Sequence, residues 1–167
     1  MPAAVLGAPG VRYDKQLYRH EPHNEIYGDC HRTAMACVLD LPPHHVPHFY
    51  QQWVRDGGDG VTTRAAKWLA KNFGLYEVDV PYMGDIGVQE LLKSLGEWNP
   101  GVRYLMGGRS PRGTDHTVVC LGNKIEHDPA QQGGGLVGPL SNGLYIVTYY
   151  VPMHLHPTPP SFLLEAT

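Results

Sequence analysis

Residues 28–43 have the sequence Gly-Asp-Cys-His-Arg-Thr-Ala-Met-Ala-Cys-Val-Leu-Asp-Leu-Pro-Pro, and this stretch decides the predicted fold. Apolar residues recur at helical spacing from Cys30 to Leu41, which predicts a helix with one buried face. Asp29 is a suitable N-cap, and the prolines at 42–43 end the helix. The sulfur of Cys30 is therefore expected at a helix N-terminus, where unpaired N–H groups and aligned peptide dipoles favour negative charge.

This placement matters for the chemistry of Cys30, because a thiol reacts as its thiolate. The backbone amides at the same helix end can also face an oxyanion that develops on a substrate. We therefore treat Cys30 as a candidate nucleophile. The alternative is that Cys30 only begins the buried face with Ala34 and Cys37, since buried cysteines are common. Cys37 and Cys120 lie on apolar faces and are predicted to be core residues.

A thiol nucleophile needs a base within reach, and the base needs a partner that orients it. His116 starts a β-rich run, Gly122-Asn123 supplies a turn, and Asp128 ends the returning run before a proline, so a hairpin brings His116 and Asp128 together. A plain two-residue turn would pair Thr117 with Asp128 and put the histidine and the acid on opposite faces. We therefore predict a bulge or a longer loop, with Gly122 or Asn123 in a left-handed conformation. The alternatives are a surface or core histidine and an acid that only forms the strand-end turn.

Helix-forming and strand-forming segments are separated along the chain. Apolar spacing predicts further helices over residues 47–55, 62–72 and 85–96, the first of which would bury Phe49, Tyr50 and Trp53. Strands are predicted over residues 75–80, 102–106, 117–121, 124–127 and 144–151. N-terminal helices packed against a C-terminal antiparallel sheet define an α+β domain. A length of 167 residues fits one domain over residues 1–167, with an irregular arm over 1–28 and an extended tail over 152–167.

Three segments together resemble the papain-like cysteine peptidases that process bacteriocin leaders at double-glycine sites. The segments are the Asp29-Cys30 pair that opens a helix of small residues, the run from His116 to Val119, and the closing pair Asp128-Pro129. The chain is also similar to small uncharacterised bacterial and phage members of that superfamily. The resemblance spans residues 24–151. It implies a papain-like fold with Cys30 as nucleophile, His116 as base and Asp128 as the residue that orients the base.

The resemblance also bears on the oxyanion hole, the substrate groove and the reaction. A glutamine upstream of the cysteine donates to the oxyanion in that family, and the matching position here is Asn24, with Gln16 a less favoured substitute. Our further hypothesis is that Tyr27, His31 and the loop that ends at Asp115 line the groove. We expect a thiol-dependent hydrolase or acyl transferase that acts on a peptide or amide bond. The alternative is a catalytically weakened module of the same fold that binds a protein or peptide partner.

Composition argues against several other classes of protein. The net charge is −3 and no cluster of Lys and Arg is present, so we expect no nucleic-acid partner. No apolar run reaches the length of a membrane span, and residues 1–10 do not resemble a secretory signal. Three widely spaced cysteines are an odd number and do not form a disulfide framework, so we expect free thiols and a cytoplasmic location.

Ten histidines raise the alternative of a metal-dependent hydrolase, with His154 and His156 as a possible ligand pair. No His-Glu-x-x-His or Cys-x-x-Cys motif is present, so we predict no metal ligands and no cofactor. The three glycines at 133–135 lack the Lys-Ser/Thr of a phosphate-binding loop. We predict instead a loop that lies beside the site.

Overall fold

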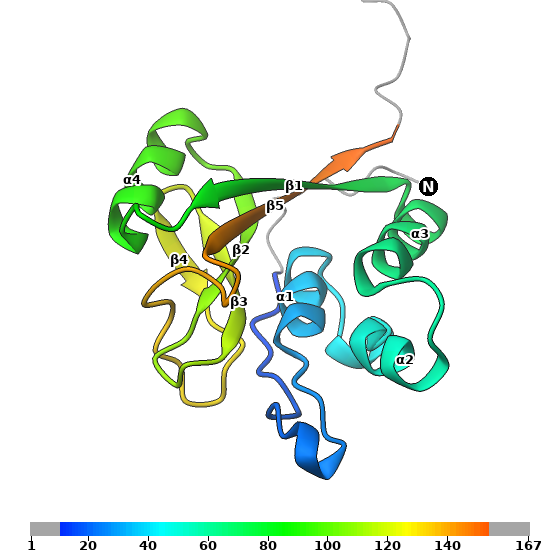
Figure 1. Ribbon diagram of the computed structural model, residues 1–167. Helices are drawn as coiled ribbons and strands as arrows, with labels where there is room; N and C mark the ends of the chain where they lie inside the picture. The colour runs from blue at the N-terminus through cyan, green and yellow to red at the C-terminus, as the bar shows by residue number, and fades with distance from the viewer. Residues whose placement is uncertain (1–10, 154–167) are drawn as a thin grey trace, which may run out of the picture.

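The computed structural model describes residues 11–153, and its helices and strands follow the predicted order (Figure 1). The elements are α1 (Cys30–Val38), α2 (Phe49–Asp56), α3 (Val61–Phe73), β1 (Leu75–Met83), α4 (Val88–Trp98), β2 (Arg103–Arg109), β3 (Asp115–Leu121), β4 (Lys124–His127) and β5 (Leu144–Pro152). The described part of the predicted arm, residues 11–28, contains only the 3-10 helix Pro22–Asn24. Most of the predicted tail lies outside the described residues.

The strands form one five-stranded antiparallel sheet within the described part of the chain, in the order β1-β5-β2-β3-β4. Side chains alternate between the two faces of a strand, and two separate apolar clusters result. Leu105 and Val119 pack with α1, α2 and α3. Met106 and Val118 pack with α4. Helices therefore cover both faces of an antiparallel sheet, which confirms the general α+β class.

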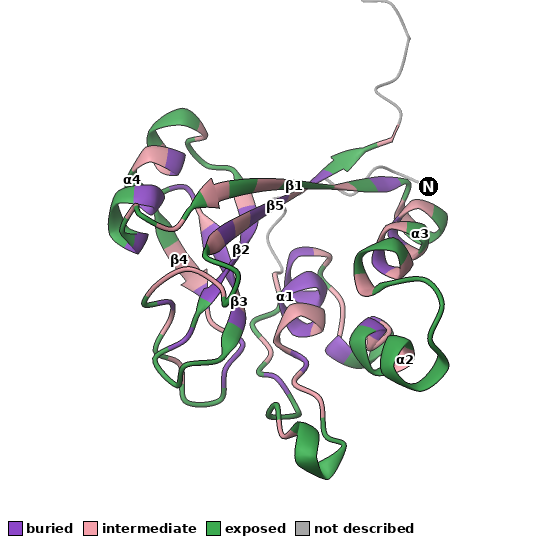
Figure 2. Ribbon diagram, viewed as in Figure 1, coloured by how far each residue is buried: buried purple, intermediate pink, exposed green. Residues whose placement is uncertain are grey.

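Helix α1 is the most deeply buried helix, as Figure 2 shows by its purple ribbon. Ala34, Met35 and Cys37 are each at most 1% exposed. The helix begins at Cys30 as predicted, with Thr33 N donating its first hydrogen bond to Asp29 O at 2.9 Å. Because α1 packs against β3 and β2, it holds its N-terminal residue over the centre of the sheet.

The prediction for α2 is wrong in part. Phe49 is 4% exposed and contacts Trp68 of α3 with ring centroids 6.0 Å apart, as an inward residue should. Tyr50 and Trp53, however, are 37% and 41% exposed. Helix α2 lies next to α3 in Figure 1 and packs against it, and this contact leaves Tyr50 and Trp53 exposed. The end of α3 is confirmed, since Gly74 adopts the left-handed conformation at φ 63°.

The β3–β4 hairpin contains the predicted irregularity. Gly122 is left-handed, at φ 56°, and Leu121 pairs with Lys124 across a two-residue turn. The register then shifts between Cys120 and Val119, because Cys120 pairs with Ile125 whereas Val119 pairs with His127. This bulge inserts one extra residue on β4 and reverses the facing of everything beyond it. The acid at 128 is thereby brought to the same face as His116.

Candidate active site

Cys30 differs from the other two thiols in its exposure. It is the first residue of α1 and is half-buried, whereas Cys37 and Cys120 are buried, and all three are free. Burial raises the pKa of both Cys37 and Cys120 to about 12. The two core thiols are therefore protonated and enclosed at neutral pH, as predicted for core residues. Cys30 sits where the unpaired amides of a helix N-terminus favour a charged sulfur.

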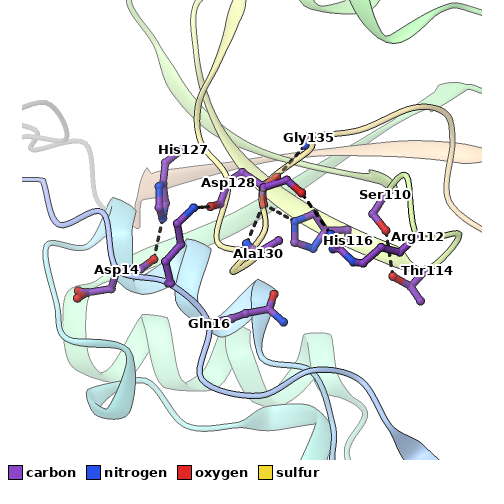
Figure 3. A network of polar contacts seen from close by, with 12 residues as sticks. Asp14, Gln16, Ser110, Arg112, Thr114, His116, His127, Asp128, Ala130 and Gly135 are labelled. Carbon is purple, nitrogen blue, oxygen red and sulfur yellow. Dashed lines mark hydrogen bonds and ion pairs between the residues drawn. The ribbon is translucent and has the colours of Figure 1, made fainter.

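His116 and Asp128 are joined by a short hydrogen bond. The two atoms, His116 Nε2 and Asp128 Oδ1, lie 2.7 Å apart in Figure 3, and the His116 side chain is only 3% exposed. Burial by itself lowers the pKa of His116, but the contacts with Asp128 and with Cys30 outweigh it and raise that pKa to about 9. Burial likewise opposes ionisation of Asp128, yet its hydrogen bonds lower the pKa of that carboxyl to about 2. The pair is therefore stable as imidazolium and carboxylate.

Two backbone amides fix Asp128 from the other side. Ala130 N donates to Oδ1 and Gly135 N donates to Oδ2, each at 2.8 Å (Figure 3). Gly135 is left-handed at φ 63°, a conformation that glycine adopts without strain. The loop at 133–135 thus lies beside the site as predicted. Its direct bond to the acid was not predicted, although an Asx-type turn from Asp128 to Ala130 has a recognisable local signature.

Cys30 and His116 line the same pocket, which has a volume of about 140 Å³. Nε2 of His116 is occupied by Asp128, so Nδ1 is the ring nitrogen left for a second partner. Cys30, on the same pocket, contributes to the raised pKa of His116. The structure therefore brings together the three residues that the sequence proposed as nucleophile, base and orienting acid.

The N-terminal arm contributes the side chain of Gln16 to this pocket. Gln16 lines it and is 8% exposed, and its Nε2 donates to Tyr18 O at 2.8 Å while its Oε1 is buried without a hydrogen-bond partner. The arm is held against the segment after β4, because Gln16 N donates to Pro129 O at 2.8 Å and Lys15 Nζ donates to Asp128 O at 2.7 Å. Long-range contacts, rather than any local motif, place Gln16 here.

Asp29 ties the arm to the helix that carries Cys30. Its side chain does not cap α1, contrary to the prediction. Instead, Oδ1 accepts from Tyr18 N at 2.9 Å and Oδ2 accepts from Arg32 at 2.7 Å, and the residue is fully buried. A buried carboxylate with a charged partner and a backbone donor is well compensated. Asp29 therefore positions Gln16 and Cys30 relative to each other.

The other proposed site residues are more scattered. Asn24 is exposed on the 3-10 helix, donates to Glu21 at 3.2 Å and does not line the pocket of Cys30. Tyr27 packs its ring against those of His20 and Tyr50. Asp115 lines the pocket, and its carboxylate accepts two hydrogen bonds from Ser141 at 2.7 Å. His31 does not line the pocket of Cys30 but lines a second one, together with Thr117.

Within residues 11–153, no group of three or more His, Cys, Asp or Glu is arranged to hold a metal ion. His154 and His156, the predicted ligand pair of the metal alternative, lie outside the described residues. None of the described helices combines the length and the apolar character that crossing a membrane requires.

Comparison with known proteins adds no family assignment. No family model, no curated protein and no solved structure matches the chain.

Proposed function

We propose that this protein is a thiol-dependent hydrolase or acyl transferase of the papain-like class, acting on a peptide or related amide bond through Cys30, His116 and Asp128. The observation that carries the proposal is that a half-buried thiol at a helix N-terminus, Cys30, and a histidine, His116, line one pocket. His116 is also hydrogen-bonded to the carboxylate of Asp128 at 2.7 Å. Nucleophile, base and orienting group in this order form the arrangement that thiol catalysis requires.

The proposed reaction starts from a pair in which the Cys30 sulfur is a thiolate and Nδ1 of His116 holds its proton. The sulfur attacks the substrate carbonyl carbon, and the carbonyl oxygen takes the negative charge of the tetrahedral intermediate. His116 then gives its proton to the leaving amine, the carbon–nitrogen bond breaks and a thioester with Cys30 forms. Water attacks the thioester while the neutral His116 takes one of its protons, and release of the Cys30 thiolate restores the starting pair. An amine acceptor in place of water gives acyl transfer.

Gln16 is the better candidate for the side-chain oxyanion donor. It lines the pocket with Cys30, whereas Asn24 bonds to Glu21 on the exposed 3-10 helix. One N–H of the Gln16 amide is used by Tyr18 O, which leaves the second N–H for a substrate oxygen. The backbone N–H of Cys30 is the second donor in this proposal, because the first N–H groups of a helix have no intrahelical partner.

Two measurements test the proposed function. The protein is treated with Nα-acetyl-norleucine chloromethyl ketone, and the modified cysteine is mapped by mass spectrometry. We expect Cys30 alone to be alkylated, because Cys37 and Cys120 are buried and protonated. The release of 4-nitrophenolate from 4-nitrophenyl acetate is then followed over many turnovers, and Cys30→Ser should abolish it.

The core thiols provide the matched controls. Cys37→Ser and Cys120→Ser should leave both the labelling of Cys30 and the turnover unchanged in whatever fraction of the protein is folded. Equal labelling of a core thiol, or turnover that survives in Cys30→Ser, would contradict the proposal. Labelling of Cys30 without any turnover would favour the alternative of a catalytically weakened module that binds a peptide.

A further inference from the structure

A second pocket is lined by residues next in sequence to Cys30 and His116. It has a volume of about 280 Å³, close to the lower end of small-molecule sites, which begin at about 300 Å³. His31 directly follows Cys30, and Thr117 directly follows His116. Cys30, His116 and Gln16 themselves line the first pocket and not this one. The second pocket therefore borders the pair without containing it.

Two acidic side chains line this pocket. Both Glu77 and Asp79 belong to β1, and among the described lining residues none is Lys or Arg. Burial lowers the pKa of His31 more than Asp79 raises it, so this imidazole supplies no positive charge at pH 7. Burial and the charge of Asp79 raise the pKa of Glu77 to about 7, so a cation bound beside Glu77 would favour its ionised form.

The polar groups around Glu77 lack partners. Its Oε2 is buried without a hydrogen bond, whereas Asp79 accepts one from Thr148 at 2.6 Å. Tyr150 stands directly opposite Glu77 across the β1–β5 ladder, so their side chains share a face. Tyr150 is 6% exposed, its hydroxyl has no partner, and its pKa is raised by burial and by the charges of Glu77 and Asp79. The unpaired Oε2 of Glu77, which lines the second pocket, is costly unless a ligand completes it, whereas Tyr150 does not line that pocket.

We propose that this second pocket binds a protonated amine, carried by the substrate or by an acyl acceptor, through Glu77 and Asp79. The inference rests on the proposed function, because the pocket borders the pair Cys30 and His116. An ammonium group supplies three donors and a positive charge, which are what the free Oε2 of Glu77 and the two carboxylates lack. The apolar side chains that line the same pocket, such as Ala65 and Ile146, suit the methylene stem of a lysine-like chain.

The first arm of the test places the amine on the acyl side of the reacting carbon. Nα-acetyl-lysine chloromethyl ketone and Nα-acetyl-norleucine chloromethyl ketone differ by one ammonium group at the end of the side chain. We expect Cys30 to react at least about tenfold faster with the lysine reagent, since charge-assisted hydrogen bonds are the strong ones. In Glu77→Gln/Asp79→Asn this preference should disappear, while the rate with the norleucine reagent stays unchanged.

The second arm places the amine on the acceptor. The enzyme turns over 4-nitrophenyl acetate in the presence of 1,5-diaminopentane or pentylamine, and the acetylated amine is quantified. A preference for the diamine that is lost in Glu77→Gln/Asp79→Asn assigns the pocket to an acceptor. A preference confined to the lysine reagent assigns it to the substrate side chain. No preference in either arm, or a preference that survives the double substitution, overturns the proposal.

Controls separate this inference from the proposed function. Glu90→Gln removes an exposed carboxylate on α4 and should change neither preference. The double variant should fold, because glutamine and asparagine keep the shapes of the two side chains and burial already opposes the ionisation of Glu77. Its unfolding midpoint in urea should match or exceed that of the unsubstituted protein. Equal labelling of Cys30 by both reagents, together with no preference for the diamine, overturns this inference alone, whereas no labelling by either reagent overturns the proposed function as well.

Discussion

The two halves of the candidate site are held in different ways. On the sheet side, His116 and Asp128 are 12 residues apart in one hairpin, and two backbone amides lock the acid. On the helix side, the surroundings of Cys30 depend on an arm whose contacts reach up to 115 residues along the chain. Local structure therefore brings His116 and Asp128 together, whereas tertiary contacts between distant segments form the surroundings of Cys30.

The largest expected effect comes from breaking the sheet side. Asp128→Asn keeps the shape of the side chain but removes the charge that holds His116 protonated and oriented. We expect turnover of 4-nitrophenyl acetate to fall about 10²-fold, within the range that general acid–base catalysis contributes. The hairpin itself should persist, which the far-ultraviolet circular dichroism spectrum can check. A variant with full activity would show that the hydrogen bond at 2.7 Å has no catalytic role.

On the helix side, a substitution of Asp29 removes the contacts that connect the arm to α1. Asp29→Ala removes a buried acceptor for Tyr18 N and the partner of Arg32, and we expect it to destabilise the fold by about 2–3 kcal/mol. Urea unfolding measures this change. Asp59→Ala is the matched control, because it removes an exposed partner of Lys67 and should leave the urea midpoint nearly unchanged. Equal effects of the two substitutions would refute a special role for Asp29.

Substitutions of Gln16 and Asn24 test which of these two side chains in the arm donates to the oxyanion. Gln16→Ala should lower the turnover of 4-nitrophenyl acetate by about 10-fold or more, because an oxyanion donor is lost. Asn24→Ala should change it less than about twofold, because the Asn24 side chain is exposed and bonds to Glu21. Both rates are compared at saturating ester, so that weaker binding is separated from slower chemistry. The reverse ranking would restore the oxyanion role that the sequence suggested for Asn24.

The smallest expected effect is a pH dependence of stability. The pKa of His116 is raised from 6.5 to about 9, so its stabilisation is complete below pH 6.5 and is lost as the pH rises through about 9. The pKa of Asp128 is lowered from 3.8 to about 2, so its stabilisation is complete above pH 3.8 and is lost as the pH falls through about 2. Both contributions are complete only between pH 3.8 and pH 6.5. The difference in unfolding free energy between the unsubstituted protein and Asp128→Asn should therefore be largest in this range, by about 1 kcal/mol or more relative to lower and higher pH.

This pH profile is measured by urea unfolding at pH 3, 5.5 and 9.5. A difference that does not change across these values would show that the pair is not stabilised by charge.

Much of the geometry around Cys30, His116 and Asp128 was accessible from the local sequence. The start of α1 at Cys30 follows from helical spacing after Gly28-Asp29. The bulge in the β3–β4 hairpin follows from the requirement that His116 and Asp128 share a face, and the register shift confirms it. Both features depend on neighbouring residues and on the fixed periods of helices and strands, which a single sequence displays.

The sequence by itself determined the element order, the burial of Cys37 and Cys120, and the hairpin that joins His116 to Asp128. Only the tertiary structure decided that Gln16 rather than Asn24 lines the pocket of Cys30. It also decided that the Asp29 side chain accepts a hydrogen bond from Tyr18 in the arm instead of capping α1. It also decided which pocket holds the carboxylates of β1. The physical reason is range: hydrophobic and turn patterns act over a few residues, whereas these polar contacts join segments that approach each other only after the helices have packed on the sheet.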